Sequence, residues 1–425
     1  MGIKQGGCQV LQLAAMPPLS RKKRGDLWGY RHSFRSRDPG GRALEADGFG
    51  ARCQEGIDLP SGSVILAGMD LADRLLTLVQ IDSVIRHEEA LCDFFATRAS
   101  AWTDYEVVRV GRSLALRPRR RVHDMLITLA GHLDTVPPTK ENPPRIDGGR
   151  VWGLGAADMK AGLAVMWGLL DAPVEDAFCD LAFIFYDGEE GPYADNGLGP
   201  LLDAAPWIVD ETDLAICLEP TDNTIQLGCL GTINAVVRFS GRPAHSARPW
   251  QGDNAIHKAA PVLSRLAAFS PRDERYGPEG ALVFREVISA TRAGGGTARN
   301  VVPDEFTLNV NYRYPPSKSE DEAVAFLRAI AGADEGLSEV EVFDFCPAGA
   351  IPEDNAALDR LRQRLGLPEL VKQAWTDVGR FSAHGVAAIN FGPAENDQCH
   401  QPDESTSIAL LREGDELLRR FLCDD

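Results

Sequence analysis

The chain has 425 residues, 44% of them apolar and 25% charged, which is ordinary for a globular protein and leaves room for two domains. Its formal net charge of −18 at pH 7 argues against nucleic acid as a partner, because proteins bind phosphate backbones through Lys and Arg. No apolar run reaches the roughly 18–20 residues that a membrane helix needs, so we expect no membrane span. The chain has nine cysteines, and none of them form closely spaced pairs. This pattern favours reduced thiols in the cytoplasm over a disulfide framework.

The first 68 residues differ from the rest of the chain. They contain ten Lys and Arg against six Asp and Glu, including RKKR (21–24), and they show no sustained apolar period. QVLQLAAM (9–16) is too short and too polar for a signal-peptide core, and its basic cluster follows it. We expect residues 1–68 to be a disordered extension. The alternatives are translation from an upstream start codon, with the true chain beginning at Met69, and binding of nucleic acid or of a surface by this segment.

From Met69 the sequence becomes regular, and MDLADRLLTLVQIDS predicts a first amphipathic helix. The apolar run MLITLA (125–130) then predicts a strand that leads into GHLDTVP (131–137). Residues two apart on a strand point to the same side. His132 can therefore offer an imidazole to a metal, while Asp134 orients that imidazole or supports the site.

The same pattern of a buried-type segment followed by a polar side chain recurs in three further strands, and GAADMKAG supplies another candidate at the start of an apolar helix. The segments and their candidate residues are GAADMKAG (155–162) with Asp158, LAFIFYD (181–187) with Glu189 and Glu190, LAICLEP (214–220) with Glu219, and AAINFGP (387–393) with His400. Strands that are apolar on both faces predict a parallel sheet covered by helices. Ligands bind beyond the carboxyl ends of such strands. We therefore expect these side chains to meet in one site.

The residue types at these ends suit two zinc ions. Zinc takes imidazole and carboxylate ligands, and a catalytic zinc keeps one position open for water. Two histidines and three carboxylates serve two metals if one carboxylate bridges them, as in two-metal hydrolases. One carboxylate of Glu189 and Glu190 is then free to act as a base. For Cys399, beside His400, an ordinary thiol near a filled site is the favoured interpretation over a zinc ligand.

The middle of the chain predicts a separate unit. After GCLGT (228–232) come TINAVVRFSG (232–241), an apolar helix over 254–270, FTLNVNYRY (306–314), DEAVAFLRAIAGA (321–333) and VEVFDF (340–345). This order of strand, helix, strand, helix and strand predicts a small α+β insertion with one helical face. The surrounding domain resumes near residue 346 and is therefore discontinuous.

Taken together, GHLDTVP, GLGAADMKAG, DGEEG (187–191), LEPT (218–221) and His400 resemble the dizinc amidohydrolase and peptidase (M20-like) family. That family includes succinyl-diaminopimelate desuccinylase, acetylornithine deacetylase, aminoacylase and the carboxypeptidase G type. The resemblance runs from about residue 69 to the end. It is closest to the actinobacterial type of succinyl-diaminopimelate desuccinylase, on long stretches such as YDGEEGPYADNGLGPL (186–201), AHSARPWQGDNAIHKAAPVL (244–263) and AWTDVGRFSAHGVAAINFGP (374–393).

The resemblance implies an α/β fold of two parts. Residues 69–229 and 346–425 would form a zinc-hydrolase catalytic domain, whose mainly parallel central sheet is covered by helices. Residues 230–345 would form an inserted α+β lid and dimerisation domain. The protein would then be a cytoplasmic homodimer, paired through this inserted domain.

The resemblance also assigns metal ligands. His132 and Glu219 would hold one zinc, Glu190 and His400 would hold the other, and Asp158 would bridge the two. Cobalt would be a substitute for zinc.

Catalytic and substrate-binding roles follow from the same resemblance. Asp134 would sit behind His132, and Glu189 would be the general base. His245, in GRPAHSARP, would reach the reacting carbonyl across the dimer interface. Residues expected to contact the polar ends of the substrate are Asn300, Arg313, Thr376 and Arg380.

Three functional interpretations remain open. The first is a metal-dependent amide hydrolase that removes succinate from N-succinyl-L,L-2,6-diaminopimelate, in lysine and cell-wall precursor biosynthesis. The second is a sister enzyme with the same metals, such as an acetylornithine deacetylase, an aminoacylase or a peptidase. The third is a catalytically silent homologue that binds an N-acyl amino acid or serves as a scaffold, and an intact Glu189 speaks against it.

Overall fold

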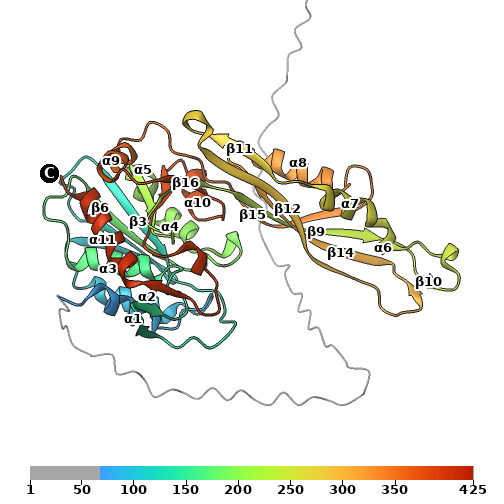
Figure 1. Cartoon of the computed structure of the whole chain (residues 1–425), viewed down its shortest axis with the longest axis horizontal. Helices are drawn as coiled ribbons and strands as arrows, with labels where there is room; N and C mark the ends of the chain where they lie inside the picture. Colours follow the sequence, from blue (N-terminus) through green and yellow to red (C-terminus); the bar gives the residue numbers. More distant parts are fainter. Residues whose placement is uncertain (1–67, 425) are drawn as a thin grey trace, which may run out of the picture. The chain divides into compact units, whose positions relative to one another are not determined.

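The computed structural model describes residues 68–424 (Figure 1), so the expected extension lies outside the described residues apart from Gly68. The first helix, α1 (Leu71–Val79), begins where Asp70 accepts a hydrogen bond from the amide of Ala72 at 3.2 Å. Such an N-cap satisfies one of the free amides at a helix start. Leu75 and Leu78, three residues apart, are buried on one side of α1. The amphipathic helix predicted after Met69 is therefore confirmed.

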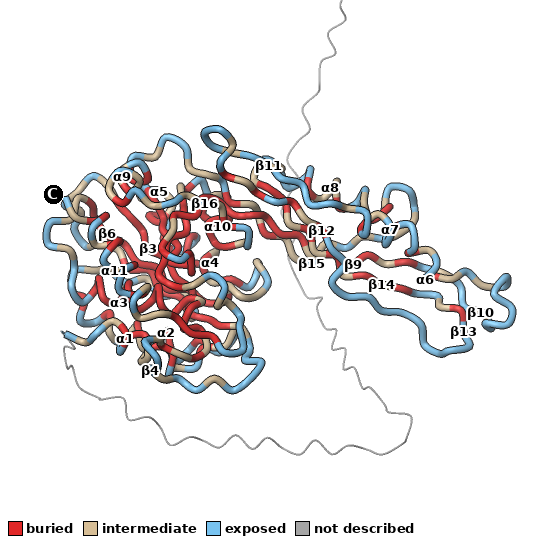
Figure 2. The backbone as a smooth tube through the Cα atoms, in the orientation of Figure 1, coloured by how far each residue is buried: buried red, intermediate tan, exposed pale blue. Residues whose placement is uncertain are grey.

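An eight-stranded sheet forms the larger body of the fold, and its four central strands run parallel. The strands, in spatial order, are β1 (Tyr105–Val110), β2 (Ser113–Pro118), β6 (Asp180–Tyr186), β3 (Leu126–His132), β7 (Leu214–Cys217), β17 (Ala388–Asn390), β8 (Ile225–Cys229) and β16 (Glu369–Lys372). The parallel strands β6, β3, β7 and β17 are the four that the apolar runs predicted. All residues of these four strands are buried, and Figure 2 shows β3 and β6 at the buried centre of this body.

Alternate residues of the central strands enter two different cores, as the pleat of a strand requires. On β6, Phe183 and Phe185 pack into one core, while Ala182 and Ile184 pack into the other. Helices that supply the first core are α1, α2 (Glu89–Ala99), α3 (Lys160–Asp171), α9 (Ala356–Leu365) and α11 (Ile408–Leu422). Helices that supply the second are α4 (Leu198–Ala204), α5 (Trp207–Glu211) and α10 (Val378–Ala383). Helices thus cover both faces, and the predicted α/β class is confirmed.

A second, antiparallel sheet has five strands, all within residues 231–346. In spatial order they are β11 (Arg272–Tyr276), β12 (Leu282–Gly295), β14 (Glu305–Tyr314), β9 (Gly231–Ser240) and β15 (Glu339–Cys346). One face packs on α6 (Ala255–Lys258), α7 (Ala260–Ala268) and α8 (Glu320–Ile330). The strand–helix–strand–helix–strand prediction was incomplete, because it missed β11 and β12. Burial alternates along residues 282–289 of β12, where Leu282, Phe284 and Ile288 are buried. Apolar residues at alternate positions are a strand signal that the sequence already contained.

The single helix expected over 254–270 was wrong, because the structure has two. Helix α6 ends at Lys258, and α7 starts at Ala260 with Pro261 in its first turn. Proline has no amide hydrogen to donate, so it interrupts the ladder of helical hydrogen bonds but fits a helix start.

Two small sheets complete the fold: β4 (Arg145–Asp147), β5 (Arg150–Trp152) and β18 (Ser405–Ser407) form one, and β10 (Ala244–His245) and β13 (Val301–Val302) the other. Within residues 68–424, no helix combines the length and apolar character needed to cross a membrane. The seven cysteines of that range are free thiols.

Candidate metal centre

His132 is the last residue of β3, and Asp134 follows it at the carboxyl edge of the sheet. The imidazole is buried, with 1% of its side chain exposed. Its Nδ1 lies 3.0 Å from the backbone oxygen of Asp134 and 3.5 Å from its carboxylate. These contacts fix the ring so that Nε2 points to the remaining candidates. Asp134 therefore lies behind His132, as expected.

The five predicted ligands lie together in what we call the ligand cluster: His132, Asp158, Glu190, Glu219 and His400. Nε2 of His132 lies 3.2 Å from Asp158 Oδ1 and 3.9 Å from Glu219 Oε1. Nε2 of His400 lies 2.8 Å from Glu190 Oε1 and 3.6 Å from Asp158 Oδ2. Asp158 thus presents one oxygen to each histidine, which is the arrangement a bridging carboxylate requires.

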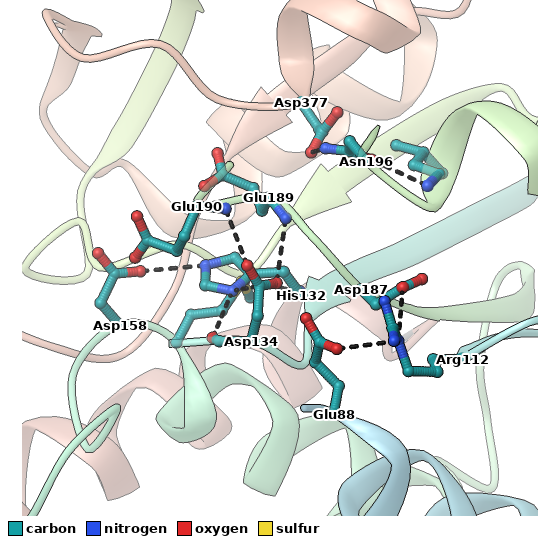
Figure 3. A network of polar contacts seen from close by, with 12 residues as sticks. Glu88, Arg112, His132, Asp134, Asp158, Asp187, Glu189, Glu190, Asn196 and Asp377 are labelled. Carbon is teal, nitrogen blue, oxygen red and sulfur yellow. Dashed lines mark hydrogen bonds and ion pairs between the residues drawn. The ribbon is translucent and has the colours of Figure 1, made fainter. Parts of the chain in front are cut away.

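Asp134 also organises the segment that follows β6. Its two carboxylate oxygens accept hydrogen bonds from the backbone amides of Glu189, at 3.1 Å, and Glu190, at 2.9 Å (Figure 3). One carboxylate therefore orients a histidine and holds two consecutive glutamates. Glu190 turns toward His400, whereas the Glu189 carboxylate makes no hydrogen bond with any described residue.

The cluster crowds several buried carboxylates together. Burial and repulsion by Asp158 raise the pKa of Glu219 to about 7. Burial raises the pKa of Glu189 well above its usual range; the charge of His132 opposes this shift, and Glu219 and Glu190 add to it. Oε1 of Glu219 is buried, with no hydrogen-bond partner among residues 68–424. Crowded, desolvated carboxylates beside two imidazoles fit divalent metals, which take these ligand types.

Two residues of this site were missed by the sequence analysis. Glu404 accepts hydrogen bonds from the amides of Gly155, Ala157 and Asp158 at 2.8, 2.8 and 3.0 Å, and so holds the loop that presents Asp158. Lys372 is buried and donates to the backbone oxygen of Pro220, next to Glu219, at 3.0 Å. Neither carries a recognisable local motif, although Glu404 follows His400 by four residues.

The expected substrate contacts fall into two places. Arg313 lines a cavity of about 430 Å³ with Arg285 and with the apolar side chains of Leu230, Val283 and Val287. Burial lowers the pKa of the Arg313 guanidinium. Near α10, the hydroxyl of Thr376 is buried and has no hydrogen-bond partner in the described part of the chain.

Arg380 is committed to protein groups. Its guanidinium lies 3.7 Å from the ring centroid of Tyr193, and Nη2 donates to the Tyr193 backbone oxygen at 2.6 Å. Its Nε donates to Asp377 at 3.1 Å, and Asp377 also accepts from Asn196 at 2.8 Å (Figure 3). In this structure Arg380 therefore braces the segment after Glu190.

His245 and Asn300 lie together but outside the ligand cluster. The amide of Ser246 donates to the Asn300 backbone oxygen at 2.9 Å, where β10 pairs with β13. Strand β9 begins at Gly231, directly after the eight-stranded sheet, and runs ten residues to Ser240. At about 3.3 Å per residue this strand spans roughly 30 Å. β10 follows its far end (Figure 1), so His245 is exposed there and away from the cluster of its own chain.

Comparisons with known proteins agree with this geometry. A model of the peptidase family M20/M25/M40 matches residues 128–424. A Corynebacterium glutamicum succinyl-diaminopimelate desuccinylase is 31% identical over 385 residues, covering 87% of this chain and 98% of that protein. A Mycobacterium tuberculosis protein, provisionally named succinyl-diaminopimelate desuccinylase DapE, is 38% identical over 350 residues, covering 81% of this chain and 96% of that protein.

Solved structures support the fold. Aminopeptidase PepT from Bacillus cereus has a TM-score of 0.67 at 19% identity, covering 83% of this chain and 97% of that one. An M20 metallo-carboxypeptidase from Sulfolobus solfataricus has a TM-score of 0.66 at 12% identity, covering 83% and 99%. With the family model spanning more than half of the sequence, the chain belongs to the M20/M25/M40 peptidase family, as its motifs indicated.

Proposed function

We propose that this chain is a metal-dependent amide hydrolase that converts N-succinyl-L,L-2,6-diaminopimelate and water into succinate and L,L-diaminopimelate. We further propose two zinc ions, replaceable by cobalt, as its cofactor. The observation that carries the proposal is Asp158, whose two oxygens face His132 and His400, with Glu189 beside this pair. The names of the two bacterial relatives support the choice of substrate.

Bound zinc would supply Lewis acidity and lower the pKa of a coordinated water. Glu189 accepts the proton of the attacking water, because its carboxylate makes no hydrogen bond within residues 68–424 that would occupy it. A bond forms between the water oxygen and the amide carbon, and the amide C–N bond breaks. Glu189 returns the proton to the leaving nitrogen.

The cavity beside Arg313 supports an anionic acyl group. The proposed substrate carries carboxylates, and the protein has a net charge of −18, so local positive charge must supply the attraction. Arg313 and Arg285 provide two guanidinium groups at a cavity whose other walls include Leu230, Val283 and Val287. A guanidinium can bond both oxygens of a carboxylate, and the apolar walls accommodate methylene groups.

A panel of N-acyl amino acids tests the substrate. Purified, zinc-loaded protein should hydrolyse N-succinyl-L,L-diaminopimelate with a far higher kcat/KM than N-acetylornithine. A higher kcat/KM for the acetyl substrate would make the chain a sister deacylase instead.

Glu189→Gln tests the base. The substitution should abolish turnover and leave two zinc ions bound, because it is Glu190, and not Glu189, that bonds a cluster histidine. Asp134→Asn is the comparison, since it alters the acceptor of both glutamate amides and should weaken zinc binding as well. Loss of both metals from Glu189→Gln would show that the roles of Glu189 and Glu190 are reversed.

We also propose a homodimer in which His245 acts on the partner's site. The span of roughly 30 Å along β9 separates His245 from its own cluster and supports a role in another subunit. His245→Ala should lower kcat by about 10²–10³, the range for one oxyanion donor, with zinc retained. Mixing His245→Ala with Glu189→Gln should restore activity after subunit exchange, because each mixed dimer has one intact site. Exchange without recovered activity would exclude action across the dimer.

A further inference from the structure

A row of hydrogen bonds crosses three strands of the five-stranded sheet, on the face opposite its helices. Nε of Arg313 on β14 donates to Asn311 Oδ1 at 3.1 Å. Nδ2 of Asn311 donates to Asn234 Oδ1 on β9 at 2.8 Å, and Nδ2 of Asn234 donates to Asp344 Oδ2 on β15 at 3.2 Å. Asn311 and Asp344 both pair with Asn234 in the sheet register, so the backbone itself aligns the row.

The row continues into the segment that carries the proposed base. Oδ1 of Asp344 accepts a hydrogen bond from the backbone amide of Tyr193 at 3.1 Å. Tyr193 begins η1 (Tyr193–Asp195), three residues after Glu190. Asp344 therefore has two contacts. Its Oδ2 bonds the row that leads to Arg313, and its Oδ1 bonds the segment that follows Glu189 and Glu190.

The direction of every bond in the row is fixed by its ends. A guanidinium can only donate, and an ionised carboxylate can only accept. Asn311 and Asn234 must therefore point their oxygens toward Arg313 and their amide nitrogens toward Asp344. Asp344 is the one member of this row that accepts on both sides, from Asn234 and from Tyr193.

We infer that Asp344 is a positioning residue for the reaction, which orients Arg313 through the two asparagines and holds the segment after Glu189 and Glu190 through the Tyr193 amide. The kinetic part of this inference rests on the proposed function. The bond to Tyr193 can be measured without any substrate.

Two variants that differ in the position of the carboxylate test this. Asp344→Asn keeps the shape but adds an amide group that must face either the Asn234 amide or the Tyr193 N–H, so one bond is lost. The double variant combines Asn234→Asp with Asp344→Asn. Its carboxylate at position 234 accepts from Asn311 and from the new amide at position 344, whose own oxygen accepts from the Tyr193 N–H. Every donor is satisfied again with the charge moved by one strand.

Asp344→Asn should lower kcat/KM for the succinyl substrate by about 10- to 100-fold, the range expected when one hydrogen bond to a charged group is lost. Both kcat and KM should change, because Arg313 binds substrate and the Tyr193 segment adjoins the base. Hydrogen exchange at the Tyr193 amide should accelerate, and zinc content should stay the same. The double variant should recover most of the activity and the slow exchange.

Glu341→Gln is the matched control, because Glu341 lies on β15, is exposed and lies 3.5 Å from the surface Arg238, away from the row. It should match the unaltered protein in kinetics and exchange. Equal kinetics and equal exchange for Asp344→Asn and Glu341→Gln would overturn the inference, as would a double variant no better than Asp344→Asn. If the unaltered chain hydrolyses no N-acyl amino acid, the proposed function fails, while the exchange data still decide whether Asp344 holds Tyr193.

Discussion

Replacing Glu404 should reveal how strongly the Asp158 loop depends on one distant carboxylate. Oε2 of Glu404 accepts the amide of Gly155, and Oε1 accepts the amides of Ala157 and Asp158. Glu404→Gln keeps one oxygen but turns an amide group toward one of these donors. One buried donor is then left without a partner, which costs about 1–3 kcal/mol of unfolding free energy.

The pH dependence of this cost has a defined sign. Burial is the main cause that raises the pKa of Glu404 from its ordinary value of 4.5 to about 7, against the three backbone hydrogen bonds. A raised pKa means that the folded state binds the proton more tightly than the unfolded state. The resulting stability is present below pH 4.5 and is lost as the pH rises through about 7, a change of up to roughly 3 kcal/mol. Glutamine does not titrate and lacks this change.

The assay is urea unfolding of chelator-treated protein at about pH 5 and about pH 8, on either side of the Glu404 pKa, comparing the unaltered chain with Glu404→Gln. The stability gap should be about 1–3 kcal/mol at the acidic pH, and it should shrink or reverse at the alkaline pH as unaltered Glu404 ionises. Asp403→Asn, at the exposed neighbouring residue, removes the same charge and should show no such change. A gap of equal size at both pH values would refute the reasoning. Zinc affinity of Glu404→Gln should also fall, because the loop bearing Asp158 loses a tether.

Three other outcomes are expected. In Gly162→Ala the new Cβ would lie 2.4 Å from the backbone oxygen of Leu218, beside Glu219. This overpacking should destabilise the fold by roughly 1–3 kcal/mol, and it should weaken zinc binding. Gly168→Ala, in the same helix with no atom nearer than 3.7 Å, should instead stabilise it, by about 0.5–1 kcal/mol in urea unfolding. Removing the metal with a chelator should abolish turnover and lower Tm, because the cluster carboxylates repel one another without cations; an unchanged Tm would contradict this. A chain starting at Met69 should keep its Tm and turnover, since the described core begins at Ala72, and aggregation of that chain would show otherwise.

The sequence alone determined the centre of the fold and indicated the candidate ligands at its edge. The four parallel strands were readable because each is a short apolar run, and burial on both faces leaves few other structures for such a run. His132, Glu190 and Glu219 could be placed at one edge because chain direction brings the carboxyl ends of parallel strands together there. Asp158 lies just before α3 and His400 ten residues after β17, and their roles came from the family resemblance. The motifs around them were long enough to indicate the family.

Only the tertiary structure decided which residues hold that site in place. Glu404 contacts Gly155 across 249 positions of the sequence, and Asp344 contacts Tyr193 across 151. Such bonds arise from the packing of distant segments, and neither residue lies in a pattern that marks it locally. The same holds for the remote position of His245, which follows from the length of β9 and the sheet that contains it. Local periodicity determines where strands begin and end. Long-range contacts determine which residues hold a site in place and where a side chain such as that of His245 lies.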